Sequence, residues 1–92
     1  MFFKVILSAM VGDDEMRTHE FSASAYQLLD EDDTNVQHIL TPPFPEPLDG
    51  FDNETKIFLE EAGFVKTFAG SYCYSYDLDT ELCNIAKLHI FV

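Results

Sequence analysis

Carboxylates are the side chains of this sequence best placed to do chemistry. The 92 residues include 17 Asp and Glu against 5 Lys and Arg, which gives a formal net charge of −12. Carboxylates in this number can pair with Lys and Arg of a partner, or they can bind divalent cations. The candidates for partner binding are Asp30, Glu31, Asp32, Asp33, Glu60, Glu61, Asp13, Asp14, Glu15, Asp77 and Asp79.

Several of these acids occupy positions that a purely stabilising sequence would avoid. The run from Asp30 to Asp33 follows a predicted helix, and Glu60 and Glu61 fall in the last turn of another. The helix dipole is already negative there, so each acid costs about 0.3–1 kcal/mol at low salt. On a helix, residues three or four apart stand about 5–6 Å from one another, a spacing that roughly imitates a phosphate backbone. We therefore predict that the acidity serves binding, with solubility alone as the alternative.

The sequence predicts no metal site, no cofactor and no catalysis. Neither Asp30 to Asp33 nor Asp77 to Glu81 has the glycine and the final glutamate of an EF-hand loop. The three histidines, His19, His38 and His89, are scattered and lack zinc-ligand spacing with the cysteines. Because no nucleophile with a paired base and no phosphate-binding loop is recognisable, we expect a protein that is not an enzyme.

The two cysteines, Cys73 and Cys83, do not make a disulfide framework. They could face each other across the last hairpin, but a change of one residue in the turn breaks that register. Free, buried thiols are therefore expected. Nothing in the sequence orients a Cys-His nucleophile.

The charge also limits the class of partner. Nucleic acid and anionic membranes are repelled, so direct binding to either is not expected. The natural partner is a host protein with a basic, nucleic-acid-binding surface. We predict a small acidic inhibitor, encoded by a phage or another mobile element, that blocks this surface as DNA-mimic anti-restriction or anti-CRISPR proteins do. That comparison rests on size and charge, and no motif assigns the chain to a family.

A second hypothesis is a non-catalytic structural or assembly module. Such a module would self-associate, for instance as a homodimer, and its charge would serve only solubility. The contact would be made by the last strand, Leu82 to Val92, or by the aromatic row Tyr72, Tyr74 and Tyr76.

Hydrophobic periodicity predicts the elements that carry these residues. The predicted elements are a strand over residues 2–11, a turn at Gly12, a return strand over Glu15 to Phe21, a helix over Ser22 to Leu29, a strand over Val36 to Leu40, a proline-rich connector over Thr41 to Pro47, a helix over Glu54 to Ala62 capped by Asp52 or Asn53, an alternating segment over Phe64 to Tyr76 interrupted at Gly70, and a last strand from Leu82. The tyrosine row is expected to face the core or its rim.

This order of elements predicts one α+β domain over residues 1–92. We expect a mainly antiparallel sheet of four or five strands, with two helices packed on one face. The apolar segment Met1 to Leu7 contains Lys4 and is followed by acids rather than by a cleavage site. It is therefore interpreted as a strand of a cytoplasmic protein and not as a signal peptide.

Overall fold

A computed structural model describes residues 2–12, 14–32, 34–43, 50–79 and 83–91. These residues form six strands, one α-helix and one short 3-10 helix. In chain order the elements are β1 (Phe3–Val11), β2 (Glu15–Leu29), β3 (Asn35–Thr41), α1 (Asn53–Glu61), β4 (Val65–Lys66), η1 (Phe68–Gly70), β5 (Tyr72–Asp77) and β6 (Ile85–Phe91).

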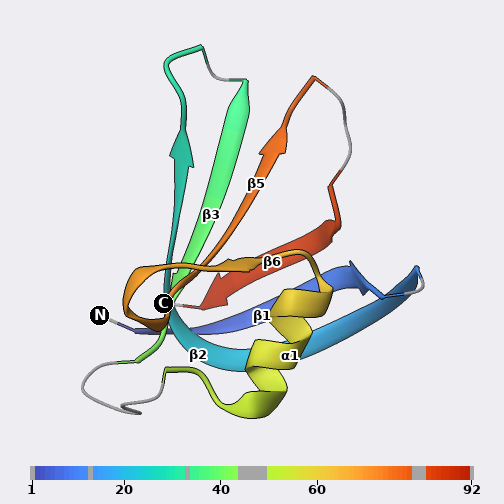
Figure 1. The fold of residues 1–92 in the computed structure, drawn as a ribbon, viewed down its shortest axis with the longest axis vertical. Helices are drawn as coiled ribbons and strands as arrows, with labels where there is room; N and C mark the ends of the chain where they lie inside the picture. Colours follow the sequence, from blue (N-terminus) through green and yellow to red (C-terminus); the bar gives the residue numbers. More distant parts are fainter. Residues whose placement is uncertain (1, 13, 33, 44–49, 80–82, 92) are drawn as a thin grey trace.

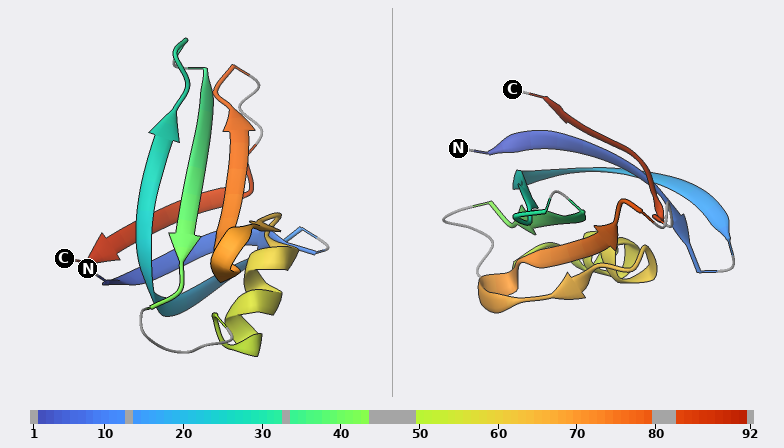
Figure 2. Two further views of the ribbon diagram at one scale, coloured as in Figure 1. Left: turned by 60° about the vertical axis from the view of Figure 1, so that its left-hand side comes forward. Right: turned by 90° about the horizontal axis from the view of Figure 1, so that it is seen from above.

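The strands form one antiparallel sheet in the order β4-β5-β3-β2-β1-β6. β2 belongs to two parts of this sheet, because its first part up to Ala23 pairs with β1 whereas its second part from Ser24 pairs with β3. We call β6, β1 and the first part of β2 sheet A. Sheet B is the second part of β2 with β3, β5 and β4. Figures 1 and 2 show β2 curving from one part into the other, so that the two sets of strands run in different directions.

The helix predicted over Ser22 to Leu29 is wrong, because these residues continue β2. Every residue from Ser24 to Leu29 has a partner on β3. The apolar residues that suggested a helix also fit a strand, with Ala25 facing the core and Leu28 facing outward. Pairing with β3 decides between the two conformations, and a pattern of eight residues does not contain that information.

The predicted α+β fold with two helices is therefore also wrong. The described residues form a six-stranded antiparallel sheet with one short helix, with 58% strand and 15% helix. The strands predicted over residues 2–11 and over Val36 to Leu40 are confirmed. The return strand from Glu15 is confirmed as well, but it continues to Leu29.

α1 confirms the second predicted helix. Asp52 caps it, since Oδ1 of Asp52 accepts a hydrogen bond from the Thr55 backbone N–H at 2.8 Å. Hydrogen bonds from the side chain and backbone of Thr55 lower the pKa of Asp52. The helix ends before Gly63, which has a φ of +102° and lies so close to Tyr74 that a Cβ there would be 2.9 Å from the ring. Glycine therefore suits this position in both conformation and space.

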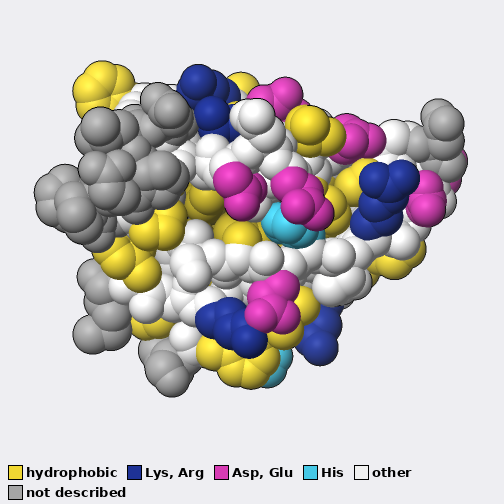
Figure 3. Space-filling view, turned by 90° about the horizontal axis from the view of Figure 1, so that it is seen from below, with side chains coloured by type: hydrophobic (Ala, Val, Ile, Leu, Met, Phe, Trp, Pro, Cys, Tyr) yellow, Lys and Arg dark blue, Asp and Glu magenta, His cyan; other side chains and the backbone are white. Residues whose placement is uncertain are grey.

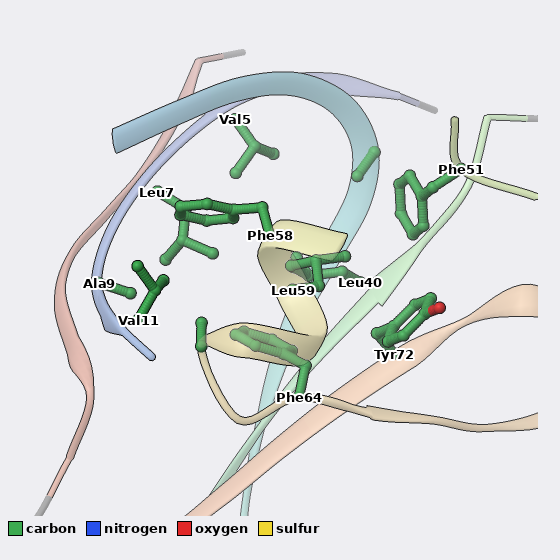
Figure 4. Close-up of a cluster of buried hydrophobic side chains, with 12 residues drawn as sticks. Val5, Leu7, Ala9, Val11, Leu40, Phe51, Phe58, Leu59, Phe64 and Tyr72 are labelled. Carbon is green, nitrogen blue, oxygen red and sulfur yellow. The ribbon is translucent and has the colours of Figure 1, made fainter. Parts of the chain in front are cut away.

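The core lies between α1 and the concave side of the sheet. Alternate residues of β1, among them Val5 and Leu7, are almost fully buried. Figure 4 shows side chains from β1, α1 and sheet B meeting at this centre. The other large members are Leu40, Phe51, Phe58, Leu59, Phe64 and Tyr72.

The alternating segment after Phe64 is confirmed as β4 and β5, with η1 and its Gly70 at the predicted interruption. The tyrosine row lies on the inner face, as expected: Tyr72 is buried, and Tyr74 and Tyr76 are half-buried.

β6 confirms the last predicted strand over Ile85 to Phe91, while Leu82 and Val92 lie outside the described residues. Its pairing with β1 shifts between Ser8 and Ala9. Because of this shift Ile85 packs against the core, and Ala86 is exposed.

Candidate functional site

Acidic residues from two chain connections lie together at one end of sheet B. The β2–β3 connection carries Asp30, Glu31 and Asp32, and Asp77 and Asp79 lie where β5 ends. The two connections touch, since the Leu78 backbone N–H donates to the Thr34 carbonyl at 2.8 Å. Both are at the top of Figure 1, at the far ends of the strands. We call these five residues the acidic tip; Asp33 lies outside the described residues.

Asp30 holds the first connection in shape. Its carboxylate accepts hydrogen bonds from the Thr34 backbone N–H at 2.8 Å, from the Thr34 hydroxyl at 3.1 Å and from the Asn35 backbone N–H at 3.1 Å. The backbone hydrogen bonds from Asn35 and Thr34 lower the pKa of Asp30. Asp30 is therefore an ionised turn residue, and not the acid at a helix end that the sequence suggested.

The remaining acids of the tip are exposed. Glu31 and Asp32 lie in the turn itself, and Asp79 follows Asp77, whose Oδ1 accepts a hydrogen bond from the Asp79 backbone N–H at 2.8 Å. Since the helix is absent, the 5–6 Å spacing expected for helical carboxylates does not apply. The structure instead gathers charge from two separate turns.

A second set of predicted acids lies elsewhere, at the β1–β2 connection. Asp14 and Glu15 are there, and Glu61 joins them because its carbonyl accepts a hydrogen bond from the Gly12 N–H at 3.4 Å. Glu15 forms an exposed ion pair with Arg17 at 3.2 Å. Asp13 lies outside the described residues. The sequence treated these acids and the tip as one surface, but the structure places them at different ends of the sheet (Figure 1).

Glu60 belongs to neither set. Its Oε2 accepts a hydrogen bond from the Tyr72 hydroxyl at 2.9 Å, which ties α1 to β5. Burial, together with this carboxylate, raises the pKa of Tyr72. Glu60 therefore has a structural contact of its own.

A groove between α1 and β2 was not found by sequence reasoning. His19 crosses it, with its Nε2 at 2.8 Å from the Thr55 hydroxyl and its ring stacked on Phe21. Depressions of about 200 and 370 Å³ lie against His19, and Glu54 lines both. The view from below in Figure 3 shows acidic side chains scattered over this side of the molecule, among hydrophobic and basic ones. The signal that could have found it is the spacing of His19 and Phe21, which places both side chains on the same face of a strand.

The other predicted chemistry can be placed as well. Cys73 on β5 and Cys83 before β6 are both free thiols, as expected, but they are half-buried and not buried. Within the described ranges, no three His, Cys, Asp or Glu residues are grouped as a metal site would require. No helix among those residues is long and apolar enough to cross a membrane.

Comparisons of the chain with protein families, with curated proteins and with solved structures found no match.

Proposed function

We propose that this chain is a non-catalytic inhibitor that binds the cationic, nucleic-acid-binding surface of a host protein through the acidic tip. The observation that carries the proposal is the contact between two acidic connections, in which the Leu78 backbone N–H donates a hydrogen bond to the Thr34 carbonyl. It brings Glu31 and Asp32 beside Asp77 and Asp79, although these pairs are far apart in the sequence.

Like charges gathered in this way repel one another, and a fold selected only for stability gains nothing from them. The repulsion is relieved when Lys and Arg of a partner pair with the carboxylates. A net charge of −12 also steers the chain toward positive surfaces before contact is made.

The class of target follows from the same electrostatics. Proteins that bind nucleic acid carry the most strongly cationic surfaces, because they must neutralise phosphates. The proposal places both molecules in the cytoplasm of the host cell, where the inhibitor would compete with nucleic acid for the same surface.

Assembly through β6 is the second candidate, because β6 is an edge strand of the sheet. Two features of β6 hinder such pairing: the shift in its register with β1, and Lys87 at its centre. The tyrosine row faces the core, so its side chains are too little exposed to form the dimer contact that the second hypothesis assigned to them. The acidic tip is therefore preferred.

The test is capture of host proteins on the immobilised chain, at about 50 mM and about 500 mM salt, with and without competing duplex DNA. We expect a nucleic-acid-binding protein that is captured at low salt and displaced by DNA. The double variant Glu31→Gln, Asp32→Asn should weaken this capture by up to roughly 30-fold, since exposed ion pairs are worth up to about 1 kcal/mol each. Asp30 is left intact because it holds the turn.

The matched control is Asp14→Asn, Glu15→Gln, which removes the same charge at the other end of the sheet. It should keep most of the binding. Equal losses in the two double variants would mean that overall charge, and not the tip, attracts the partner. Capture that resists both salt and DNA would contradict the proposal altogether.

A further inference from the structure

The outer face of sheet B, which points away from α1, is free of charged side chains over its central part. Its residues alternate along each strand with those that face inward. They are Ser24, Tyr26, Leu28, Gln37, Ile39, Thr41, Val65, Cys73 and Ser75. This is unusual in a chain in which 24% of the residues are charged. The outer face of sheet A, by comparison, carries the Lys4–Glu20 ion pair and Lys87.

A row of apolar side chains crosses this outer face from one strand to the next. Tyr26 is paired with Ile39, Ile39 with Cys73, and Cys73 with Val65. Tyr26 is 51% exposed and Val65 is 65% exposed, and Leu28 beside the row is 49% exposed. Large apolar groups that are uncovered and contiguous mark contact surfaces more often than isolated ones do.

Charge is confined to one end of this outer face. The acidic tip adjoins it there, since Leu28 and Asp30 line the same shallow depression as Gln37. At the opposite end β4 turns into β5 through η1, where Phe68 is 93% exposed. One end of the face is thus strongly acidic, and the other is neutral and apolar.

We propose that the outer face of sheet B binds a second copy of this chain, with the two sheets packed face to face and their strands antiparallel. Two copies of charge −12 repel wherever acidic surfaces meet, so a neutral face is the surface on which they can approach. The antiparallel arrangement sets the acidic tip of each copy over the neutral end of the other. The two tips are then separated by the length of the strands, about 20 Å for six residues, which exceeds a Debye length of about 8 Å.

The size of the face indicates how strong this dimer is. Three strands of about six residues and the two residues of β4, about 4.8 Å apart, give a face of roughly 300–350 Å² per copy. The pair would bury roughly 600–700 Å², which is below the roughly 1,200 Å² of a stable specific interface. We therefore expect a weak, reversible dimer that forms only at high concentration.

The centre of the face supplies a chemical probe. Ile39 and Cys73 form the middle of the apolar row. A two-fold axis through this point brings the Cys73 thiols of the two copies near each other. Cys83 lies outside the face, so Cys83→Ser leaves Cys73 as the single reporter thiol.

Sedimentation velocity of the full chain over a range of concentrations tests the proposal. The unmodified chain should dimerise, and more salt should strengthen the dimer by screening repulsion. Tyr26→Lys should abolish it. The control is Ile57→Lys, which makes the same charge change at an equally exposed site on α1 and should not affect it. A short bis-maleimide should link two copies of the Cys83→Ser variant but not of Cys73→Ser.

A monomer at every concentration would overturn the proposal, and so would a dimer that survives Tyr26→Lys, since the contact would then lie elsewhere, for example at β6. This inference does not depend on the proposed function. Added salt should weaken target binding through the acidic tip, whereas it should strengthen dimerisation. The two proposals can therefore be tested, and refuted, independently of each other.

Discussion

The two faces of sheet B have the same strands and the same alternation of side chains, yet they serve different ends. On the inner face Leu40 and Tyr72 are buried in the core that includes α1, whereas on the outer face Tyr26 is 51% exposed and Ile39 is half-buried. Apolar content therefore does not separate the core from the surface in this chain. The inner face is buried because the curvature of β2 places sheet A, together with α1, on that side of sheet B.

Neighbouring residues on β3 give the largest expected contrast. Leu40→Ala removes a fully buried side chain and should lower the free energy of unfolding by about 2–5 kcal/mol. Ile39→Ala, one residue away on the outer face, should cost less than about 1 kcal/mol at concentrations where the chain is monomeric. Urea unfolding of both variants makes the measurement. Equal losses would show that the outer face is also packed.

Loosening the helix that covers the inner face should have a smaller effect. Asp52→Ala removes the N-cap of α1 and should cost about 1 kcal/mol, because the Thr55 N–H loses its acceptor. Asp52→Asn keeps an acceptor in place and serves as the control. If the Asn variant is as unstable as the Ala variant in urea, the carboxylate charge and not the hydrogen bond is what matters.

The smallest effect concerns His38, which is buried on the inner face and stacked on Tyr76. Burial lowers the pKa of His38 in the folded protein. The unfolded chain, with a histidine pKa near 6.5, then binds the proton more readily. Stability should therefore be full above about pH 6.5 and should fall as the pH drops toward the lower folded value.

His38→Phe keeps a ring against Tyr76 and should remove this part of the pH dependence. Thermal unfolding between about pH 7.5 and 5 would show it as a flatter profile. The carboxylates with lowered pKa values, Asp30 and Asp52, lose their contribution only as the pH falls below about 4, so they do not obscure the comparison. If the thermal stability of the variant falls with pH as steeply as that of the unmodified chain, His38 is not the source of the pH dependence.

Sequence reasoning found those elements whose signals are local. β1 has a clean alternation of five positions, and α1 has a capping residue at one end and Gly63 at the other. The second half of β2 carries no comparable local signal. Its apolar residues fit the period of a helix and that of a strand equally well. Pairing with β3, which follows later in the chain, determines that they form a strand.

The sequence identified the acidic residues of the candidate site but not how they are arranged in space. That acids crowd around Asp30 and Asp77 is visible in the sequence, whereas their contact depends on the register of β3 against β5. Asp30 was interpreted as a helix end because the turn hydrogen bonds from Thr34 and Asn35 form only between two strands. The uncharged outer face was missed for the same reason, since its row of side chains comes from four separate strands.

The pairing of β1 with β6 has a consequence for how the chain acquires its structure. Lys4 lies opposite Phe91, so β1 receives its second neighbour only after the whole segment between these two residues has been synthesised. Until then β1 and β2 form a hairpin in which the backbone groups of β1 that point away from β2 have no strand to pair with. Contacts across such a long separation form slowly. Completion of sheet A should therefore be the last and rate-limiting step of folding, well after the β2–β3 hairpin has formed.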